Sequence, residues 1–393
     1  MGGGPWSPDT NFPTHHTARI MSREHRVLYL CRDTHVSLLG QVAGRLRGFH
    51  SWQELAGHVV TRPSVEQVGE RLWVSSLAGP AALFPLSYPP MARAISVRLV
   101  IRQLRYALKE LRFDRPLLWF YWWFFPEIAP AVDHSLAVYD IYDDHAEYDY
   151  VRGNPRRRRY SRRIEAKLLK KMDLAFAVSG ELVRQHSAVR PVEYLPNGVD
   201  VSVAEGAASA PVPADIAGLP RPIAGYLGSY DSRLDWEMVE GMAEARPDWS
   251  FVFVGGGTTG PSRPHANLHL LGNRSYPDAL RYVNQFDLAL IPFVHDALTE
   301  AVCPAKLFDY LALGKPILST RIPAVNEIVG SGDEVYRADS VEEMLAAGEI
   351  ALHETSDLPA RRMALARTFS WEHRTERAMR WIEDELRRRG RAA

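Results

Sequence analysis

Residues Thr299–Pro316 read TEAVCPAKLFDYLALGKP and carry the most informative pattern in the chain. Pro304 suits the first turn of a helix because its missing N–H group would have no partner there. Gly314 suits the left-handed conformation that ends a helix, and the residues Pro316–Ser319 after it predict a strand. We therefore expect a helix over Pro304–Leu313 that leads into a buried strand.

Lys306 and Asp309 lie three residues apart in this segment, so the predicted helix places them on one face. The N-terminus of a helix carries a partial positive charge and free N–H groups, which favour a bound phosphate. A carboxylate one turn into the helix can accept hydrogen bonds from both hydroxyls of a ribose, and a lysine beside it can neutralise a diphosphate. The pattern predicts a nucleotide site, although a surface ion pair on an ordinary helix has the same spacing.

Short apolar runs alternate with amphipathic stretches along the whole chain, which predicts an α/β protein with parallel sheets covered by helices. In the first half we expect strands at Arg26–Cys31, Arg71–Ser75, Leu117–Phe125, Leu136–Ile141 and Leu174–Val178. In the second half we expect strands at Ile223–Leu227, Ser250–Val254, Asn267–Leu271, Leu288–Pro292 and Pro316–Ser319. Residues Val201–Pro222 are rich in Ala, Pro and Gly and predict a linker.

A chain of 393 residues exceeds the size of a single hydrophobic core, so two domains are expected. We predict a Rossmann-like domain over residues 1–200, a linker over 201–222, a second Rossmann-like domain over 223–370, and a terminal helix over 371–393 that returns to the first domain. Ligands of open parallel sheets bind at the carboxyl ends of the strands. The binding residues are therefore expected in loops directly after strands, with the active site in the cleft between the domains.

The composition is that of an ordinary globular protein, with 46% hydrophobic residues, 24% charged residues and a formal net charge of zero. The zero net charge argues against a nucleic-acid partner. Two cysteines, Cys31 and Cys303, are too few for a disulfide framework. Residues Met1–Pro13 lack a basic stretch followed by an apolar core, and no stretch has the ~18 consecutive apolar residues of a membrane helix. We therefore expect a cytoplasmic protein.

Further stretches of the chain agree, in order, with the pattern of one enzyme family. They are Tyr194–Asp200 (YLPNGVD), Gly225–Trp236 (GYLGSYDSRLDW), Pro247–Gly255 (PDWSFVFVG), Leu268–Tyr276 (LHLLGNRSY) and Phe369–Trp371 with the helix after it. Together with Thr299–Pro316 they resemble the family 4 group of retaining glycosyltransferases, in the branch with a Pro-x-Lys-Leu-x-Glu-Tyr-Leu-Ala-x-Gly-Lys-Pro motif. The resemblance covers most of Arg26–Leu386.

The resemblance implies the GT-B fold, in which two Rossmann-like domains face each other across a cleft. It implies transfer of a sugar from a nucleoside-diphosphate sugar, of the UDP or GDP type, to a glycan or small-molecule acceptor, with retention of the anomeric configuration. Neither a metal ion nor another cofactor is expected. Many members carry two Glu residues, the first on the donor sugar and the second on the ribose; Asp309 falls on the second position and Ala301 on the first, with Glu300 beside it. The missing Glu leaves the donor sugar open.

The loop after the predicted strand Ile223–Leu227 begins with Gly228, which lets a backbone approach a pyrophosphate closely. Ser229 and Arg233 of this loop can bond phosphate oxygens. The family usually has an Arg directly after this Gly, whereas Arg233 is the nearest basic residue here. We therefore predict that Arg233 and Lys306 clamp the diphosphate.

A second loop, Gly255–Gly260 (GGGTTG), contains a Gly-x-Gly-x-x-Gly spacing after a predicted strand. A nicotinamide-binding turn has to open a helix, but residues 261–264 (PSRP) prevent a helix from following at once. We therefore expect only a turn near the nucleotide. Gly255, and Gly272 and Asn273 of the following loop, are assigned to donor binding, where backbone groups can contact the base.

Residues Asp140–His145 (DIYDDH) end a strand of the first half. Carboxylates and a histidine can hold a divalent metal, but these lie too close together in one segment for most of them to reach one ion. The resemblance instead places Asp144 and His145 near the donor sugar, where the histidine would bond a hydroxyl or steady a positive anomeric centre. A purely structural role for this histidine is an equal alternative.

Trp119–Phe125 (WFYWWFF) predicts the end of a doubly buried strand. Trp122, Trp123 and Phe125 could line an acceptor pocket there, because aromatic rings stack on sugar faces. The basic residues 156–171 predict a helix with a solvated face, or one that contacts anionic lipid at the inner face of the membrane.

These observations favour a nucleotide-sugar-dependent glycosyltransferase. A nucleotide-sugar 2-epimerase on the same fold is an alternative, because it would convert the donor sugar without an acceptor. A catalytically silent relative that acts as a binding partner is a second alternative, which the altered Glu pattern motivates.

Overall fold

The computed structural model describes residues 6, 11–32, 64–77, 90–355 and 357–390. Its internal contacts divide the chain into two compact units. The first unit comprises Met1–Ala177, Val183–Glu193 and Thr375–Ala393, and the second comprises Val178–Leu182 and Tyr194–Arg374. Among the described residues, none of the helices combines the length and the apolar character needed to cross a membrane.

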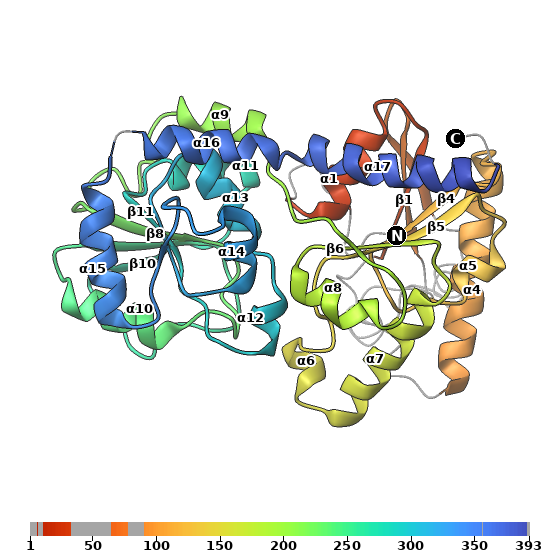
Figure 1. Cartoon of the computed structure of the whole chain (residues 1–393), viewed down its shortest axis with the longest axis horizontal. Coiled ribbons are helices and arrows are strands. Elements are labelled where there is room, and N and C mark those ends of the chain that lie inside the picture. The colour runs from red at the N-terminus through yellow and green to blue at the C-terminus, as the bar shows by residue number, and fades with distance from the viewer. Residues whose placement is uncertain (1–5, 7–10, 33–63, 78–89, 356, 391–393) are drawn as a thin grey trace, which may run out of the picture. The chain divides into compact units, whose positions relative to one another are not determined.

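The second unit is built on one six-stranded sheet (Figure 1). Its strands are β8 (Ile223–Leu227), β9 (Ser250–Val254), β10 (Leu268–Leu270), β11 (Leu288–Ile291), β12 (Ile317–Ser319) and β13 (Tyr336–Arg337). They are all parallel and lie in the order β10-β9-β8-β11-β12-β13. The chain builds from β8 to one edge of the sheet and then from β11 to the other edge. The strand order therefore reverses between β8 and β11, which is where ligands of such sheets bind.

Helices cover both faces of this sheet, because right-handed crossovers to opposite edges place their helices on opposite sides. The helices are α9 (Val201–Ala208), α10 (Trp236–Ala245), α11 (Tyr276–Val283), α12 (Ala297–Ala301), α13 (Ala305–Ala312), α14 (Pro323–Val329), α15 (Val341–Leu352) and α16 (Leu358–Thr368). α10 packs on α15, whereas α9, α11, α13 and α16 contact one another. Strands β9 and β11 are buried along their whole length as a result.

The helix predicted from the Thr299–Pro316 segment is α13, which begins one residue after Pro304. Gly314 has φ +65°, the left-handed conformation expected of it. The Lys315 N–H donates to the Tyr310 carbonyl (3.0 Å) and the Gly314 N–H donates to the Leu311 carbonyl (3.0 Å). This pair of bonds is a Schellman motif, which satisfies the last carbonyls of the helix before the chain enters β12.

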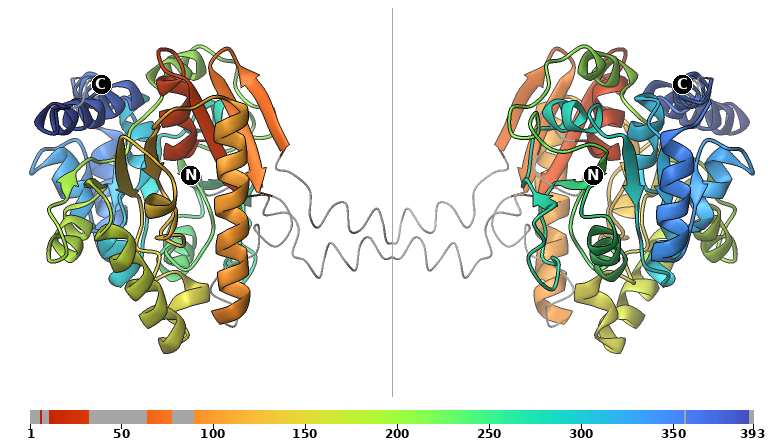
Figure 2. Two further views of the ribbon diagram at one scale, coloured as in Figure 1. Left: turned by 90° about the vertical axis from the view of Figure 1, so that its right-hand side faces the viewer. Right: turned by 90° about the vertical axis from the view of Figure 1, so that its left-hand side faces the viewer.

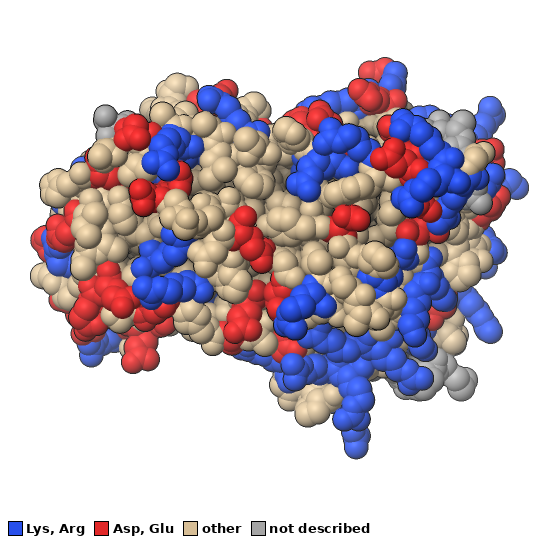
Figure 3. All heavy atoms as spheres, in the orientation of Figure 1, with Lys and Arg blue, Asp and Glu red and all other residues tan. Residues whose placement is uncertain are grey.

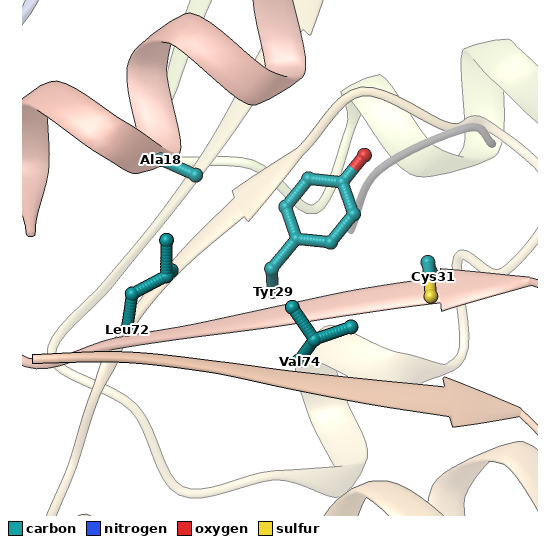
Figure 4. Close-up of a cluster of buried hydrophobic side chains, with 5 residues drawn as sticks. All are labelled: Ala18, Tyr29, Cys31, Leu72 and Val74. Atoms are coloured by element: carbon teal, nitrogen blue, oxygen red, sulfur yellow. The ribbon is translucent and has the colours of Figure 1, made fainter. Parts of the chain in front are cut away.

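The first unit contains two smaller sheets among its described residues. In one, β1 (Val27–Arg32) pairs parallel with β3 (Leu72–Leu77), which pairs antiparallel with β2 (Ser64–Gly69). α1 (Pro13–Met21) packs on this sheet through a cluster drawn in Figure 4: Ala18, Tyr29, Cys31, Leu72 and Val74. The long α4 (Pro90–Glu110), orange in Figure 2, lies beside it. The β2–β3 hairpin was not predicted from the sequence.

The other sheet of the first unit has the order β4-β5-β6-β7. Its strands are β4 (Leu117–Phe120), β5 (Leu136–Ile141), β6 (Leu174–Ala177) and β7 (Glu193–Tyr194), and its helices are α5 (Ile128–Ala131), α6 (Asp149–Arg152), α7 (Pro155–Leu169) and α8 (Gly180–Ser187). The predicted strand over Leu117–Phe125 is wrong at its end, since β4 stops at Phe120. The aromatic residues after it leave the sheet, and all of them except Trp122 stay buried, so their apolar character does not mark a strand.

Residues Val201–Ala208 form the helix α9, where a linker was predicted. The Asp200 side chain caps this helix by accepting from the Val203 N–H (3.2 Å), and α9 packs on α11 and α13. The segment therefore belongs to the second unit, which begins at Tyr194 rather than after residue 222. The last helix is α17 (Trp371–Arg388), whose residues from Thr375 onward group with the first unit.

Candidate active site

Two glycines open the carboxyl edge of the sheet in the second unit. Gly228 follows β8 directly and has φ +138°, and Gly255 follows β9 directly and has φ +145°. The Gly228 N–H donates to the Val254 carbonyl (3.0 Å). A Cβ at Gly255 would lie 2.0 Å from the Gly228 carbonyl oxygen, so the two loops can approach only because this residue is glycine. The glycines thus let the loops after β8 and β9 pack closely together at the carboxyl edge of the sheet, next to the reversal point of the strand order.

The Lys306 ammonium group lies at this edge. Its Nζ donates to the Tyr226 hydroxyl (3.2 Å) and lies 4.4 Å from the centre of the Tyr226 ring and 4.5 Å from that of Phe293. A Cβ at Gly228 would lie 3.1 Å from the same Nζ. Within the described part of the chain Lys306 makes no ion pair. Burial, with a smaller contribution from the nearby Arg233, lowers the pKa of Lys306 to about 7.

Asp309 lies one turn further along α13 and is almost fully buried. Its Oδ1 accepts a hydrogen bond from the Tyr276 hydroxyl (2.7 Å), and its Oδ2 has no hydrogen-bond donor among the described residues. Burial raises the pKa of Asp309 to about 7, while Tyr276 and Lys306 act in the opposite direction. The site therefore holds a buried carboxylate with a free oxygen close to a partly buried ammonium group.

Arg233 is already engaged by a neighbouring carboxylate. Its Nε donates to Asp231 Oδ1 (2.9 Å), and a second guanidinium nitrogen lies 2.5 Å from Asp231 Oδ2. Arg233 holds the pKa of Asp231 below its usual value, although burial opposes the shift. A diphosphate at Arg233 would thus meet a cation whose charge is shared with Asp231.

The other predicted donor-binding residues surround this edge at the surface. Ser229 is exposed and its carbonyl accepts from the Tyr226 hydroxyl (2.9 Å). Asn273 is exposed, and a Cβ at Gly256 would lie 3.0 Å from its side chain. Gly272 has φ +75°, and its carbonyl accepts from the Gly255 N–H (2.9 Å). Residues 255–267 contain no helix, as expected from the prolines after the glycine-rich turn.

The two residues at the position of the missing Glu lie on α12. Glu300 is exposed in the first turn of this helix. Ala301 is completely buried, and its carbonyl accepts a hydrogen bond from the Ser179 hydroxyl (2.6 Å). Ala301 therefore presents no atom for a sugar hydroxyl, and a contact with the donor at this position would have to come from Glu300.

In the first unit the predicted residues follow β5. Asp144 is buried and its Oδ2 accepts from an Arg162 guanidinium nitrogen (2.6 Å), and Glu147 accepts from the same nitrogen (2.9 Å). Asp144 thus ties the loop after β5 to α7, and this positioning role is the one that the contacts show. Among the described residues no group of three or more His, Cys, Asp or Glu side chains is placed to hold a metal ion.

His145 is buried and stacks on the Trp123 ring, with centroids 4.0 Å apart and planes inclined by 10°. Neither ring nitrogen has a hydrogen-bond partner. Burial lowers the pKa of His145 to about 3, and the nearby His186 adds to this effect. The histidine is therefore neutral in this structure, and two unsatisfied nitrogens are a cost that a ligand hydroxyl or a water molecule would relieve.

The three aromatic residues predicted to line an acceptor pocket do not share one environment. Trp123 and Phe125 are each only 2% exposed, whereas Trp122 is partly exposed and packs edge-on against Phe124 with centroids 5.3 Å apart. Trp122 is the one of the three that has ring surface open to solvent. The prediction of an acceptor pocket thus remains for Trp122, while Trp123 instead supports His145.

Sequence reasoning missed the residues that set the environment of Lys306 and Asp309. Tyr226 and Phe293 supply the rings around Lys306, Tyr276 supplies the donor to Asp309, and Asp231 pairs with Arg233. Tyr226 lies near the end of β8 and Phe293 lies just after β11. Their positions at the carboxyl ends of predicted strands could have marked them as site residues. Tyr276 precedes Asp309 by 33 residues and gave no such signal.

Comparisons with known proteins define the class. Residues 221–354 match the family model described as Glycosyl transferases group 1. The fold is similar to that of the trehalose-6-phosphate structure from E. coli bound with UDP-2-fluoro glucose, with a TM-score of 0.67 and 11% identity over 98% of each chain. It is also similar to Anabaena HepE in complex with UDP, with a TM-score of 0.61 and 12% identity over 97% of this chain and 98% of that one. The fold is GT-B, and together with the matched domain it supports a GT-B glycosyltransferase.

Among individual proteins, the chain is 26% identical over 278 residues to TuaH of Bacillus subtilis (strain 168). The match covers 66% of this chain and 69% of TuaH, which carries the provisional name of a teichuronic acid biosynthesis glycosyltransferase. Lys306, Asp309 and Gly228 all fall within the matched family domain. The more specific family 4 branch remains a prediction from the motif.

Proposed function

We propose that this protein transfers a sugar from a nucleoside-diphosphate sugar to a hydroxyl group of an acceptor. The observation that carries the proposal is Lys306, a partly buried ammonium group without an ion-pair partner at the point where the strand order of a parallel sheet reverses. Burial has lowered its pKa to about 7. The unliganded site therefore disfavours the protonated form of Lys306, and a bound anion would favour it. A diphosphate is the anion that suits this position.

The proposed reaction breaks the bond between the anomeric carbon and a diphosphate oxygen, so negative charge develops on the departing diphosphate. Lys306 would neutralise this charge, and Arg233 would assist if it turned from Asp231 toward the phosphate. Because these side chains supply the positive charge, we propose that transfer needs no metal ion. Asp309 would accept the ribose hydroxyls through its free oxygen. UDP, the nucleotide in the two solved complexes, is the first nucleotide to test.

Retention of the anomeric configuration is proposed from the motif resemblance. His145 is assigned to the donor sugar on the same ground, and its two unpartnered ring nitrogens support the assignment, because a sugar hydroxyl would satisfy one of them. The proposed acceptor is a glycan or a small molecule with a free hydroxyl. The provisional name of TuaH favours a glycan.

A thermal-shift panel of UDP, GDP, ADP, dTDP and NAD tests the proposed donor site. One diphosphate is expected to raise the unfolding temperature selectively, because a ligand present at 100 times its Kd stabilises the native state by about 2.7 kcal/mol. A rise with NAD alone would show that the glycine-rich turn binds a dinucleotide, and no rise with any diphosphate would favour a silent relative.

Analysis of the products then separates the enzymatic alternatives. When the protein is incubated with a sugar donor of the selected nucleoside diphosphate and no acceptor, a transferase is expected to release free sugar slowly by hydrolysis. A converted nucleotide sugar, with the diphosphate still attached, would instead identify a 2-epimerase. Anomeric assignment of the transferred sugar by NMR tests retention.

Gly228→Ala is expected to weaken diphosphate binding at least tenfold. The new Cβ would lie 3.1 Å from Lys306 Nζ and would occupy the space that a phosphate needs, and φ +138° is strained for alanine. The matched control is Gly330→Ala, which also has a positive φ (+61°) but has open space around its Cβ. Isothermal titration with the nucleotide should show a loss of affinity only in the Gly228 variant. Equal affinities in both variants would show that the phosphate does not bind at this loop.

A further inference from the structure

Helix α7 carries a row of basic side chains along its exposed side. Arg156, Arg159, Arg163, Lys167 and Lys170 are all exposed, and they follow one another at spacings of three, four, four and three residues. These spacings place them on one face, which we call the α7 basic stripe. The opposite face of α7 is buried through Ile164, Leu168 and Leu169. Over the 15 residues of the helix the stripe is about 22 Å long.

The five side chains of the stripe have no acidic partner among the described residues. The sole acid on α7 is Glu165, which is buried and accepts from the Tyr139 hydroxyl (2.7 Å). Arg158 and Arg162 of the same helix are different, because they pair with Glu147 and Asp144. These cations of the helix thus fall into two groups, Arg158 and Arg162, which pair with acids of the fold, and the stripe, which has no such pairs among the described residues.

Several other exposed arginines of this chain have acidic partners. Arg263 pairs with Glu244, and Arg387 and Arg388 pair with acids on α17. The chain as a whole has a formal net charge of zero. The α7 basic stripe is a local concentration of positive charge on a chain without net charge, and its field would orient the molecule toward an anionic surface. Figure 3 shows Lys and Arg side chains gathered where α6 and α7 lie in Figure 1.

An exposed aromatic ring lies next to the stripe. Tyr150 of α6 is 49% exposed, and its carbonyl accepts a hydrogen bond from Arg157 at the start of α7 (3.2 Å). Amphipathic aromatic rings are enriched at the level of lipid headgroups, where the ring meets the acyl boundary and the hydroxyl meets water. An unpaired cation row beside such a ring has the composition of a peripheral membrane contact.

We propose that the α7 basic stripe and Tyr150 dock this protein on an anionic lipid surface. Among the described residues the five side chains of the row are all exposed along one side of a helix, an arrangement that suits a plane of headgroups. This proposal does not depend on the transferase activity, because docking is measured without turnover. It gives the protein access to acceptors that are held at a membrane.

The test is co-sedimentation of the full chain with vesicles of phosphatidylcholine, with and without phosphatidylglycerol. Binding is expected only with phosphatidylglycerol and should weaken with salt. The triple variant R159Q/R163Q/K167Q is expected to lose affinity on the order of 100-fold, since each cation near an anionic surface contributes about a factor of five. Adding Y150S to the triple variant is expected to lower the affinity for anionic vesicles by a further few-fold.

The matched control is R263Q/R387Q/R388Q, which removes the same amount of charge from exposed arginines that already have acidic partners. It should bind vesicles like the wild type, and thermal melts check that both triple variants fold. Equal vesicle binding by the two triple variants would overturn the proposal. So would tighter binding to dextran sulfate than to the anionic vesicles, which would identify the stripe as a site for a soluble polyanion.

Discussion

Lys306→Ala is expected to lower the rate of sugar transfer about 1,000-fold, because it removes the positive charge that the departing diphosphate needs. The Lys306 ammonium is held over two aromatic rings and makes no ion pair with a carboxylate of the described residues. Its full charge would therefore be available to the leaving group in the transition state. The measurement is kcat with the donor selected by the thermal-shift panel, together with the affinity for inorganic pyrophosphate.

Lys306 also predicts the pH dependence of donor capture. Its pKa in the unliganded protein is about 7, because burial and Arg233 disfavour the ammonium form. The protonated lysine is the form that neutralises a diphosphate, so kcat/KM for the donor should be constant at low pH and should fall about tenfold per pH unit once the pH is well above this pKa. In Lys306→Arg the fall should disappear, because arginine stays protonated.

Lys315→Ala is the matched control for this prediction. Lys315 belongs to the same sequence motif and is also partly buried, but it precedes β12, at the opposite end of this strand from the carboxyl edge of the sheet. Its ammonium group donates to the Asn284 carbonyl at the end of α11. We expect its replacement to lower stability and to leave pyrophosphate affinity unchanged. Equal loss of pyrophosphate affinity in the Lys315 and Lys306 variants would mean that the motif acts through the stability of the second unit.

Replacing Lys306 should have opposite effects on activity and on stability, because burial of its ammonium group destabilises the unliganded protein. Its pKa in the folded state, about 7, lies below the ordinary value of 10.5, so its contribution to stability is present at high pH and is lost as the pH falls toward 7. Lys306→Met should therefore raise the unfolding temperature of the unliganded protein at neutral pH while it abolishes transfer. A gain in stability with a loss of activity is typical of a binding site.

The sequence predicted the second unit well, because its strands are short apolar runs with clear boundaries and its helices begin at capping residues. β8 and β9 have the predicted bounds, and the Asp235 and Ser340 side chains cap α10 and α15 by accepting from backbone N–H groups. The same signal was overlooked at α9, where Asp200 caps a helix whose small residues resembled a linker. A capping residue is thus more informative than a lack of aromatic residues.

The first unit was predicted less well, because its key contacts join residues that lie far apart in the chain. Nothing in the segment Asp140–His145 indicates that Asp144 pairs with Arg162, 18 residues later on α7. The aromatic run after β4 has the composition of a strand, and periodicity cannot separate a strand from a buried loop of the same residues. The predicted site residues could therefore be named from the sequence, whereas their partners could not.

Asp309→Asn is expected to lower the affinity for the nucleoside diphosphate about 10- to 100-fold and to leave the affinity for inorganic pyrophosphate unchanged. The reason is that hydrogen bonds to a charged acceptor contribute about 1.5–3 kcal/mol, and only the nucleoside offers ribose hydroxyls to the free oxygen of Asp309. Lys306→Ala, in contrast, should lower both affinities. Isothermal titration of the two ligands into the two variants gives four values that separate the ribose contact from the diphosphate contact.

The stability of the Asp309→Asn variant provides an independent check that the carboxylate is buried as described. The pKa of Asp309 in the folded protein is about 7, well above the ordinary value of 3.8, because burial disfavours its ionised form. Its contribution to stability is therefore present below pH 3.8 and is lost as the pH rises toward 7. Relative to the wild type, the Asn variant should gain stability as the pH rises across this range, measured by urea unfolding at several pH values.

Tyr276→Phe is the conservative partner variant, because it removes the hydrogen bond to Asp309 and keeps the carboxylate. We expect it to raise the pKa of Asp309 further and to weaken nucleotide binding less than Asp309→Asn does. If Asp309→Asn instead lowered the affinity for pyrophosphate as much as that for the nucleotide, Asp309 would act by supporting the charge of Lys306, and the ribose would have to be bound elsewhere. In that case the loss of the carboxylate in Asp309→Asn should also move the pH profile of donor capture to lower pH, because Asp309 raises the pKa of Lys306.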